Sequence, residues 1–176
     1  MSELNLPLGA KIDLPALCRN DSNYRLTLPQ SLFTRLADSC AGLRSDATLE
    51  VHFYRDLQGL NTLEGTIAIT IDLICERCLQ PFSYELNAKF KSTCDLAKVK
   101  SLRLEDKLDV VDLAADGMLD FYNYLEDCLL LELPIVPRHA DEADCGMKGD
   151  SWAYGADEIP AKENPFAVLK DLQRKS

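Results

Sequence analysis

The chain has 176 residues and a mass of 19.7 kDa, enough for one domain that buries an ordinary core without covalent crosslinks. Its formal net charge is −10 and its pI is about 4.6. Such a charge argues against wholesale wrapping of a nucleic acid, because that affinity comes largely from neutralising phosphates. No apolar run approaches the ~20 residues that span a bilayer, so we expect a soluble protein without a membrane partner.

Seven cysteines are spread along the chain, an odd number that leaves any set of disulfides incomplete. The first residues lack the cationic start and the apolar core of a signal peptide. Both features predict a cytoplasmic protein whose thiols are reduced.

A helix is predicted near the N-terminus. Thr27 and Gln30 have the spacing of a capping box, and apolar residues recur at helical spacing from Leu32 to Cys40. We expect Cys40 to pack in the core as a small hydrophobic residue. Gly42 is expected to end the helix in the left-handed conformation.

Three segments alternate between apolar and polar residues, which is the pattern of strands with one buried face. They span residues 48–54, 66–74 and 82–92. Because only one face of each is apolar, they predict an antiparallel sheet with one side in solvent. Turn residues at 58–61 and 75–81 join the three strands. Cys75 and Cys78 therefore fall in a hairpin connection, and a further short strand is predicted at 108–113.

The second half of the chain opens with a longer helix. Asp120 is a candidate N-cap before a run of helical periodicity, and Pro134 ends that run. Glu126 and Asp127 lie between its apolar positions, so both are expected to face solvent. The predicted fold is therefore α+β, an antiparallel meander packed by an N-terminal helix and this longer helix.

Three segments make up the predicted domain organisation. Residues 1–137 form a single α+β domain, and residues 138–163 form an acidic, partly flexible segment with little periodicity. Residues 164–176 form a helical tail, since Asn164 and Pro165 supply a cap and a first-turn proline.

The CxxC motif at Cys75 and Cys78 is the clearest chemical signal. Two thiols at this spacing supply half of a tetrahedral zinc site, and His139 and Cys145 are candidates for the other half. Free thiols beside a turn explain the motif equally well. A thioredoxin-like role fits poorly, because that motif starts a helix and here it lies between antiparallel strands.

Catalytic templates are missing from the sequence. It has no GxxxxGK[ST], GxGxxG or HExxH motif, and two histidines leave few groups for acid-base chemistry. We therefore predict a protein that is not an enzyme and has no small-molecule substrate.

A basic stripe is the candidate for contact with RNA, although a solvated surface explains it as well. Its members are Lys89, Lys91, Lys98, Lys100 and Arg103. Aromatic residues in strand 82–92 fall on its inward phase, so they are expected in the core rather than stacked on bases.

Three stretches together resemble the bacterial YceD family of large ribosomal RNA subunit accumulation proteins. They are CERCLQPF at 75–82, the helix from 120 that ends in LPIVPRH at 133–139, and NPFAVL at 164–169. The resemblance implies a role in the synthesis, processing or stability of 23S rRNA, with no assigned reaction. It also implies a zinc site built from the CERC hairpin and the later loop, in which Cys75, Cys78 and His139 match and Cys145 is the fourth candidate.

Three hypotheses for function follow. The first is a ribosome biogenesis factor that binds a basic ribosomal protein or a precursor of the large ribosomal subunit. The second is direct binding of 23S rRNA through the stripe from Lys89 to Arg103. The third is a thiol-dependent redox protein that uses Cys75 and Cys78.

Overall fold

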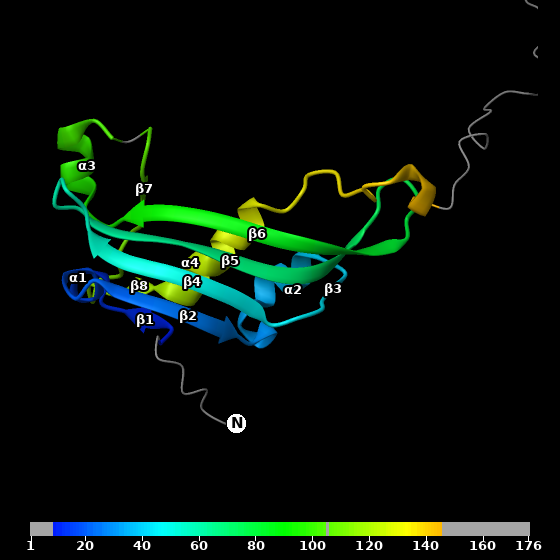
Figure 1. Ribbon diagram of the computed structural model, residues 1–176, viewed down its shortest axis with the longest axis horizontal. Coiled ribbons are helices and arrows are strands. Elements are labelled where there is room, and N and C mark those ends of the chain that lie inside the picture. Colours follow the sequence, from blue (N-terminus) through cyan, green and yellow to red (C-terminus); the bar gives the residue numbers. More distant parts are fainter. Residues whose placement is uncertain (1–8, 105, 146–176) are drawn as a thin grey trace, which may run out of the picture. The chain divides into compact units, whose positions relative to one another are not determined.

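The computed structural model describes residues 9–104 and 106–145 (Figure 1). The chain divides into two compact units, Met1–Ala140 and Asp141–Ser176, and residues 141–145 are the described part of the second. The tail helix predicted at 164–176 lies outside the described residues. The predicted boundaries at 137 and 163 stay predictions.

The described elements confirm the α+β class, with a sheet that is mainly antiparallel. The strands are β1 (Lys11–Ile12), β2 (Ser22–Leu28), β3 (Gly42–Leu43), β4 (Ala47–Arg55), β5 (Asn61–Ile74), β6 (Pro81–Thr93), β7 (Asp109–Val110) and β8 (Leu119–Asp120). The helices are α1 (Leu14–Arg19), α2 (Thr34–Ser39), α3 (Leu96–Leu102) and α4 (Phe121–Leu131), with 3-10 turns η1 (Gln30–Leu32) and η2 (Glu142–Cys145). None of the helices within the described ranges is long and apolar enough to cross a membrane.

The main sheet has the order β2-β4-β5-β6-β7, and β3 pairs with β5 beside β4. Neighbours from β2 to β6 are antiparallel, whereas β7 runs parallel to β6. The β5–β6 hairpin is long, with Ile74 opposite Pro81 at its closed end. A separate two-stranded sheet pairs β1 with β8.

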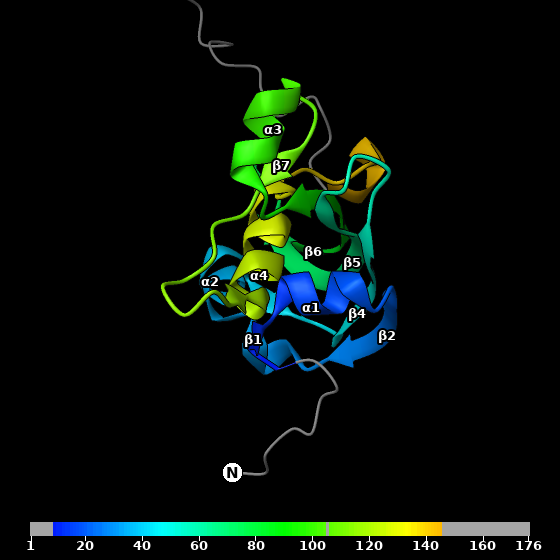
Figure 2. The same ribbon diagram turned by 90° about the vertical axis from the view of Figure 1, so that its left-hand side faces the viewer.

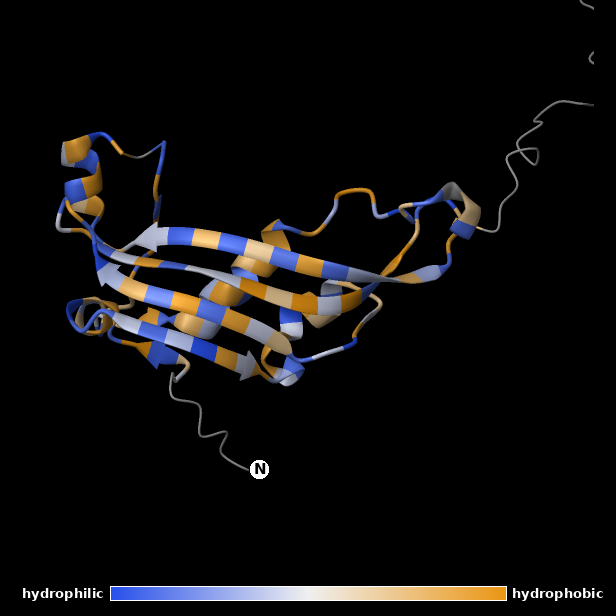
Figure 3. Cartoon of the chain, viewed as in Figure 1, coloured by the Kyte–Doolittle hydropathy of each residue, from blue (hydrophilic) through white to orange (hydrophobic). Residues whose placement is uncertain are grey.

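Alternation along β4, β5 and β6 produces one buried face, as the sequence predicts (Figure 3). The buried residues of these strands include Leu49, Val51, Phe53, Ile67, Ile69, Ile71, Leu86, Ala88 and Phe90. Residues of the opposite phase, such as Glu50 and Lys89, are exposed. The sheet therefore has an inner apolar face that must be covered.

Two helices lie against this inner face (Figure 2). α1 packs on β4 and β5 through Leu14 and Cys18, which are buried. α4 packs on β6 and on α2, and it buries Phe121, Leu125 and Leu129. Asp120 accepts a hydrogen bond from the backbone N–H of Asn123, as expected of an N-cap.

The N-terminal region differs from its prediction. Thr27 belongs to β2 and pairs with Thr48, so it does not cap a helix. Helix α2 starts after Phe33, which supplies no side-chain cap, and Gly42 begins β3 instead of ending the helix. Cys40 is half-buried and packs against the hydrophobic core, as expected. The backbone hydrogen bonds of the β2–β4 ladder outweigh the local capping pattern.

Two helices and four strands have no counterpart among the predicted elements; the helices are α1 and α3, and the strands are β1, β2, β3 and β8. Helix α1 has six residues, too few for a periodic signal, although Asp13 caps it by accepting from Ala16 N at 2.9 Å. Strand β2 lies at the sheet edge, and α3 falls inside the basic stripe. The strand predicted at 108–113 is reduced to the two residues of β7.

Glu126 corrects another prediction. It is 3% exposed, and its carboxylate accepts hydrogen bonds from Arg35 Nε at 2.8 Å and from the backbone N–H of Leu36 at 3.0 Å. Asp127 is exposed as expected and accepts from Arg35 Nη1 at 2.7 Å. The carboxylate of Glu126 thus links the start of α2 to α4. The prediction that Glu126 faces solvent is wrong, because α2 covers this side chain.

We predict that Glu126→Ala lowers the free energy of unfolding by about 2 kcal/mol, since it leaves the buried N–H of Leu36 without an acceptor. Asp127→Ala is the matched control, and its exposed ion pair contributes only about 0.5 kcal/mol. Urea denaturation of the two variants measures both values. Equal effects would show that burial of the Glu126 carboxylate is not what matters.

Candidate metal centre

The connection between β5 and β6 forms a tight knuckle around the CxxC motif. Leu79 N donates to Cys75 O at 2.8 Å, and Cys75 N donates to Gln80 O at 3.0 Å. Leu79 adopts a left-handed conformation with φ of 59°, and its side chain is exposed. This turn keeps Cys75 and Cys78 near each other and joins β5 to β6, as the sequence predicts.

The segment after α4 returns to this knuckle. Glu76 N donates to Pro137 O at 2.9 Å, and the ring of His139 lies against the ring of Phe82 with centroids 4.8 Å apart. One backbone hydrogen bond and one ring contact therefore bring His139 to the hairpin. The sequence patterns do not assign these roles to Pro137 and Phe82, although both belong to the stretches that carry the family resemblance.

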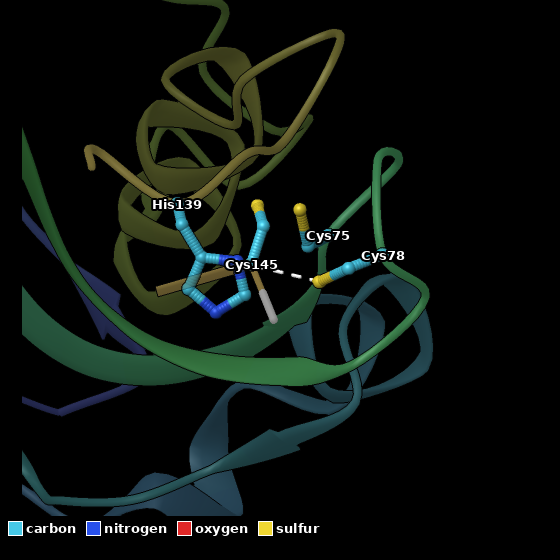
Figure 4. Close-up of side chains that lie close together, drawn as sticks. All are labelled: Cys75, Cys78, His139 and Cys145. Atoms are coloured by element: carbon cyan, nitrogen blue, oxygen red, sulfur yellow. Dashed lines mark hydrogen bonds between the residues drawn. The ribbon is translucent and has the colours of Figure 1, made fainter. Parts of the chain in front are cut away.

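The structure brings together the four residues that sequence analysis proposes as ligands, Cys75, Cys78, His139 and Cys145 (Figure 4). Their ligand atoms all lie within 4.8 Å of one another, and Cys78 Sγ is 3.6 Å from His139 Nδ1. Cys75 and Cys145 are buried, while Cys78 and His139 are half-buried. Three thiols and one imidazole are a donor set that suits a tetrahedral metal site. The cluster could therefore hold a metal ion.

The surroundings of Cys75 lower the pKa of its thiol, whereas those of Cys18 raise it. Burial by itself raises the pKa of the Cys75 thiol, but backbone N–H groups of Cys78, His139 and Arg77 hydrogen-bond to it and lower the pKa to about 5. Burial raises the pKa of Cys18 to about 12. The thiolate is the form that binds metals, so Cys75 is prepared for this role and Cys18 is a core residue.

The basic stripe does not form one row of free charges. Lys89 and Lys91 lie on β6, whereas the other three residues lie on α3 or at its end. Lys91 Nζ is 3.0 Å from the carboxylate of Glu64, and Lys98 Nζ donates to Gly59 O at 2.8 Å. Phe90 is buried against Tyr124, as expected for a core aromatic residue.

The described part of the chain is thus of the α+β class, with a Cys₃His cluster beside the closed end of the long β5–β6 hairpin. A family model described as "Large ribosomal RNA subunit accumulation protein YceD" matches residues 63–173. The chain is 33% identical over 143 residues to the Haemophilus influenzae protein of that name, which covers 80% of this chain and 82% of the relative. The chain belongs to the YceD family, which confirms the resemblance. No solved structure gives a significant match.

Proposed function

We propose that this protein is a cytoplasmic factor for biogenesis of the large ribosomal subunit. It supports the accumulation of 23S rRNA by binding a basic ribosomal protein or a precursor of the subunit, and it acts by binding rather than by catalysis. The ribosomal part of this proposal rests on the names of the family and of the Haemophilus influenzae relative. The preference for a cationic partner rests on charge.

The observation that carries the choice of partner is the pairing of the basic residues. The net charge is −10, and within the stripe Lys91 and Lys98 already contact Glu64 and Asp95. Three of the five basic residues of the stripe are then left to neutralise phosphates, whereas a cationic protein is attracted by the net negative charge and its association is accelerated. Direct binding of RNA through the basic stripe from Lys89 to Arg103 is the alternative.

The cofactor of this proposal is zinc, held by Cys75, Cys78, His139 and Cys145. Three thiolates and an imidazole are ligands that zinc prefers, and four protein ligands are typical of structural rather than catalytic sites. The ion would fasten the segment after α4 to the β5–β6 hairpin, where Glu76 and Pro137 already form a backbone hydrogen bond. Such a site favours the structural role over redox chemistry of the CxxC thiols.

We predict about one zinc ion per chain in protein purified without a chelator, and about none in the Cys75→Ser, Cys78→Ser variant. The matched control is Cys40→Ser, Cys94→Ser, which removes two half-buried thiols that lie outside the cluster. Elemental analysis by mass spectrometry measures the zinc content. Equal zinc content in the two variants would show that Cys75 and Cys78 do not bind the ion.

We predict that tagged protein isolated from growing cells retains a basic protein of the large subunit after nuclease treatment. Mass spectrometry of samples with and without nuclease makes the comparison. Loss of every ribosomal protein on nuclease treatment would favour direct RNA binding instead. Absence of ribosomal components from both samples would contradict the proposed function as a whole.

A further inference from the structure

A groove of about 540 Å³ runs between α4 and the edge of the sheet formed by β6 and β7. Its floor is apolar, with Phe90 and Leu119 buried and Val111 and Tyr124 half-buried. The hydroxyl groups of Tyr124 and Ser92 are 2.8 Å apart and hydrogen-bonded, so the polar groups of the floor are satisfied. The floor therefore offers apolar surface to a ligand.

Apolar surface continues at the end of α4. Leu131 lines the groove and is 85% exposed. Ile135 and Val136, which follow in the chain, are also exposed. Large aliphatic residues that face solvent in one short segment are typical of surfaces that bind a partner.

The rim of the groove is acidic. Its carboxylates belong to Asp109, Asp112, Asp120, Asp127 and Glu132, and Lys89 is its basic residue. Asp127 is paired with Arg35, and Asp120 caps α4. Ion pairs between described residues do not involve Asp109, Asp112 or Glu132. These three carboxylates therefore surround an apolar floor without an ion-pair partner among the described residues.

The strand beside the groove has an open edge. Among the described residues, β7 pairs only with Ser92 and Thr93, so the rest of β6 forms the edge of the sheet (Figure 1). Lys89 and Phe90 of this strand line the groove. Extended peptides bind such edges through main-chain hydrogen bonds, while their alternate side chains enter neighbouring pockets.

We infer that this groove binds an extended cationic segment of a ribosomal protein. Aliphatic side chains of the segment pack on the floor around Phe90 and Leu131, and its lysines or arginines meet Asp109, Asp112 and Glu132. The inference rests on the proposed function and adds the place of binding. A nucleic acid does not fit the groove, because its phosphates would meet the acidic rim.

The test measures binding of a fluorescein-labelled peptide of alternating lysine and valine to the full chain by fluorescence anisotropy. We expect Asp112→Lys, Glu132→Lys to weaken binding by about tenfold, because both rim charges are reversed. Asp38→Lys, Glu85→Lys is the matched control, since it changes the net charge equally at exposed acids outside the groove. We expect this control to weaken binding by at most about twofold.

A second pair of variants tests the apolar contact without changing charge. Leu131→Gln is expected to weaken binding by about fivefold, since it removes an exposed aliphatic side chain from the groove. Leu57→Gln, which replaces an exposed leucine outside the groove, is expected to leave binding unchanged. Both leucines are exposed, so neither change threatens the fold.

Two results would contradict the inference that this groove binds a cationic segment. One is failure of the unmodified chain to bind the cationic peptide, and the other is equal weakening by the groove variants and their controls. Capture of ribosomal proteins from cells separates this failure from that of the proposed function. If the Asp112→Lys, Glu132→Lys variant captures them as well as the unmodified chain does, the partner binds elsewhere on the protein. The proposed function would then be retained without the groove.

Discussion

The apolar inner face of the sheet has to be covered, and the position of α4 follows from that constraint. Strands β4, β5 and β6 each bury one phase of their side chains, and Phe121, Leu125 and Leu129 of α4 close over them. Glu126 then fixes α4 against α2 by accepting from the backbone N–H of Leu36. The direction in which the chain leaves α4 is therefore set by packing on the sheet.

Both candidate sites depend on this placement of α4. From its end the chain runs through Pro137, whose carbonyl meets the N–H of Glu76, to His139 beside the knuckle. Along its side, Tyr124 contributes to the floor of the acidic groove, and Leu131 also lines the groove. The proposed zinc would hold the chain that follows α4, and the groove beside α4 would bind the partner. One helix therefore positions both the proposed metal site and the proposed binding groove.

Sequence predicts those parts whose signal is local. Alternation identifies the three central strands, the cap at Asp120 identifies α4, and the CxxC spacing identifies half of the cluster. The capping pattern at Thr27 misleads, because strand pairing with β4 is decided by long-range hydrogen bonds. The burial of Glu126 and the acidic groove could not be predicted from the sequence, for the same reason. Each is formed by segments that are far apart in the chain and meet only in the fold.

X-ray absorption spectroscopy at the zinc edge determines whether a metal joins the β5–β6 hairpin to the chain beyond α4, as we propose. We expect three sulfur ligands and one nitrogen ligand, with the nitrogen contributed by His139 and a sulfur by Cys145. His139→Ala should then remove the nitrogen ligand and leave the sulfur signal. A spectrum of nitrogen and oxygen ligands without sulfur would mean that any bound zinc lies elsewhere and that the Cys₃His cluster does not hold it.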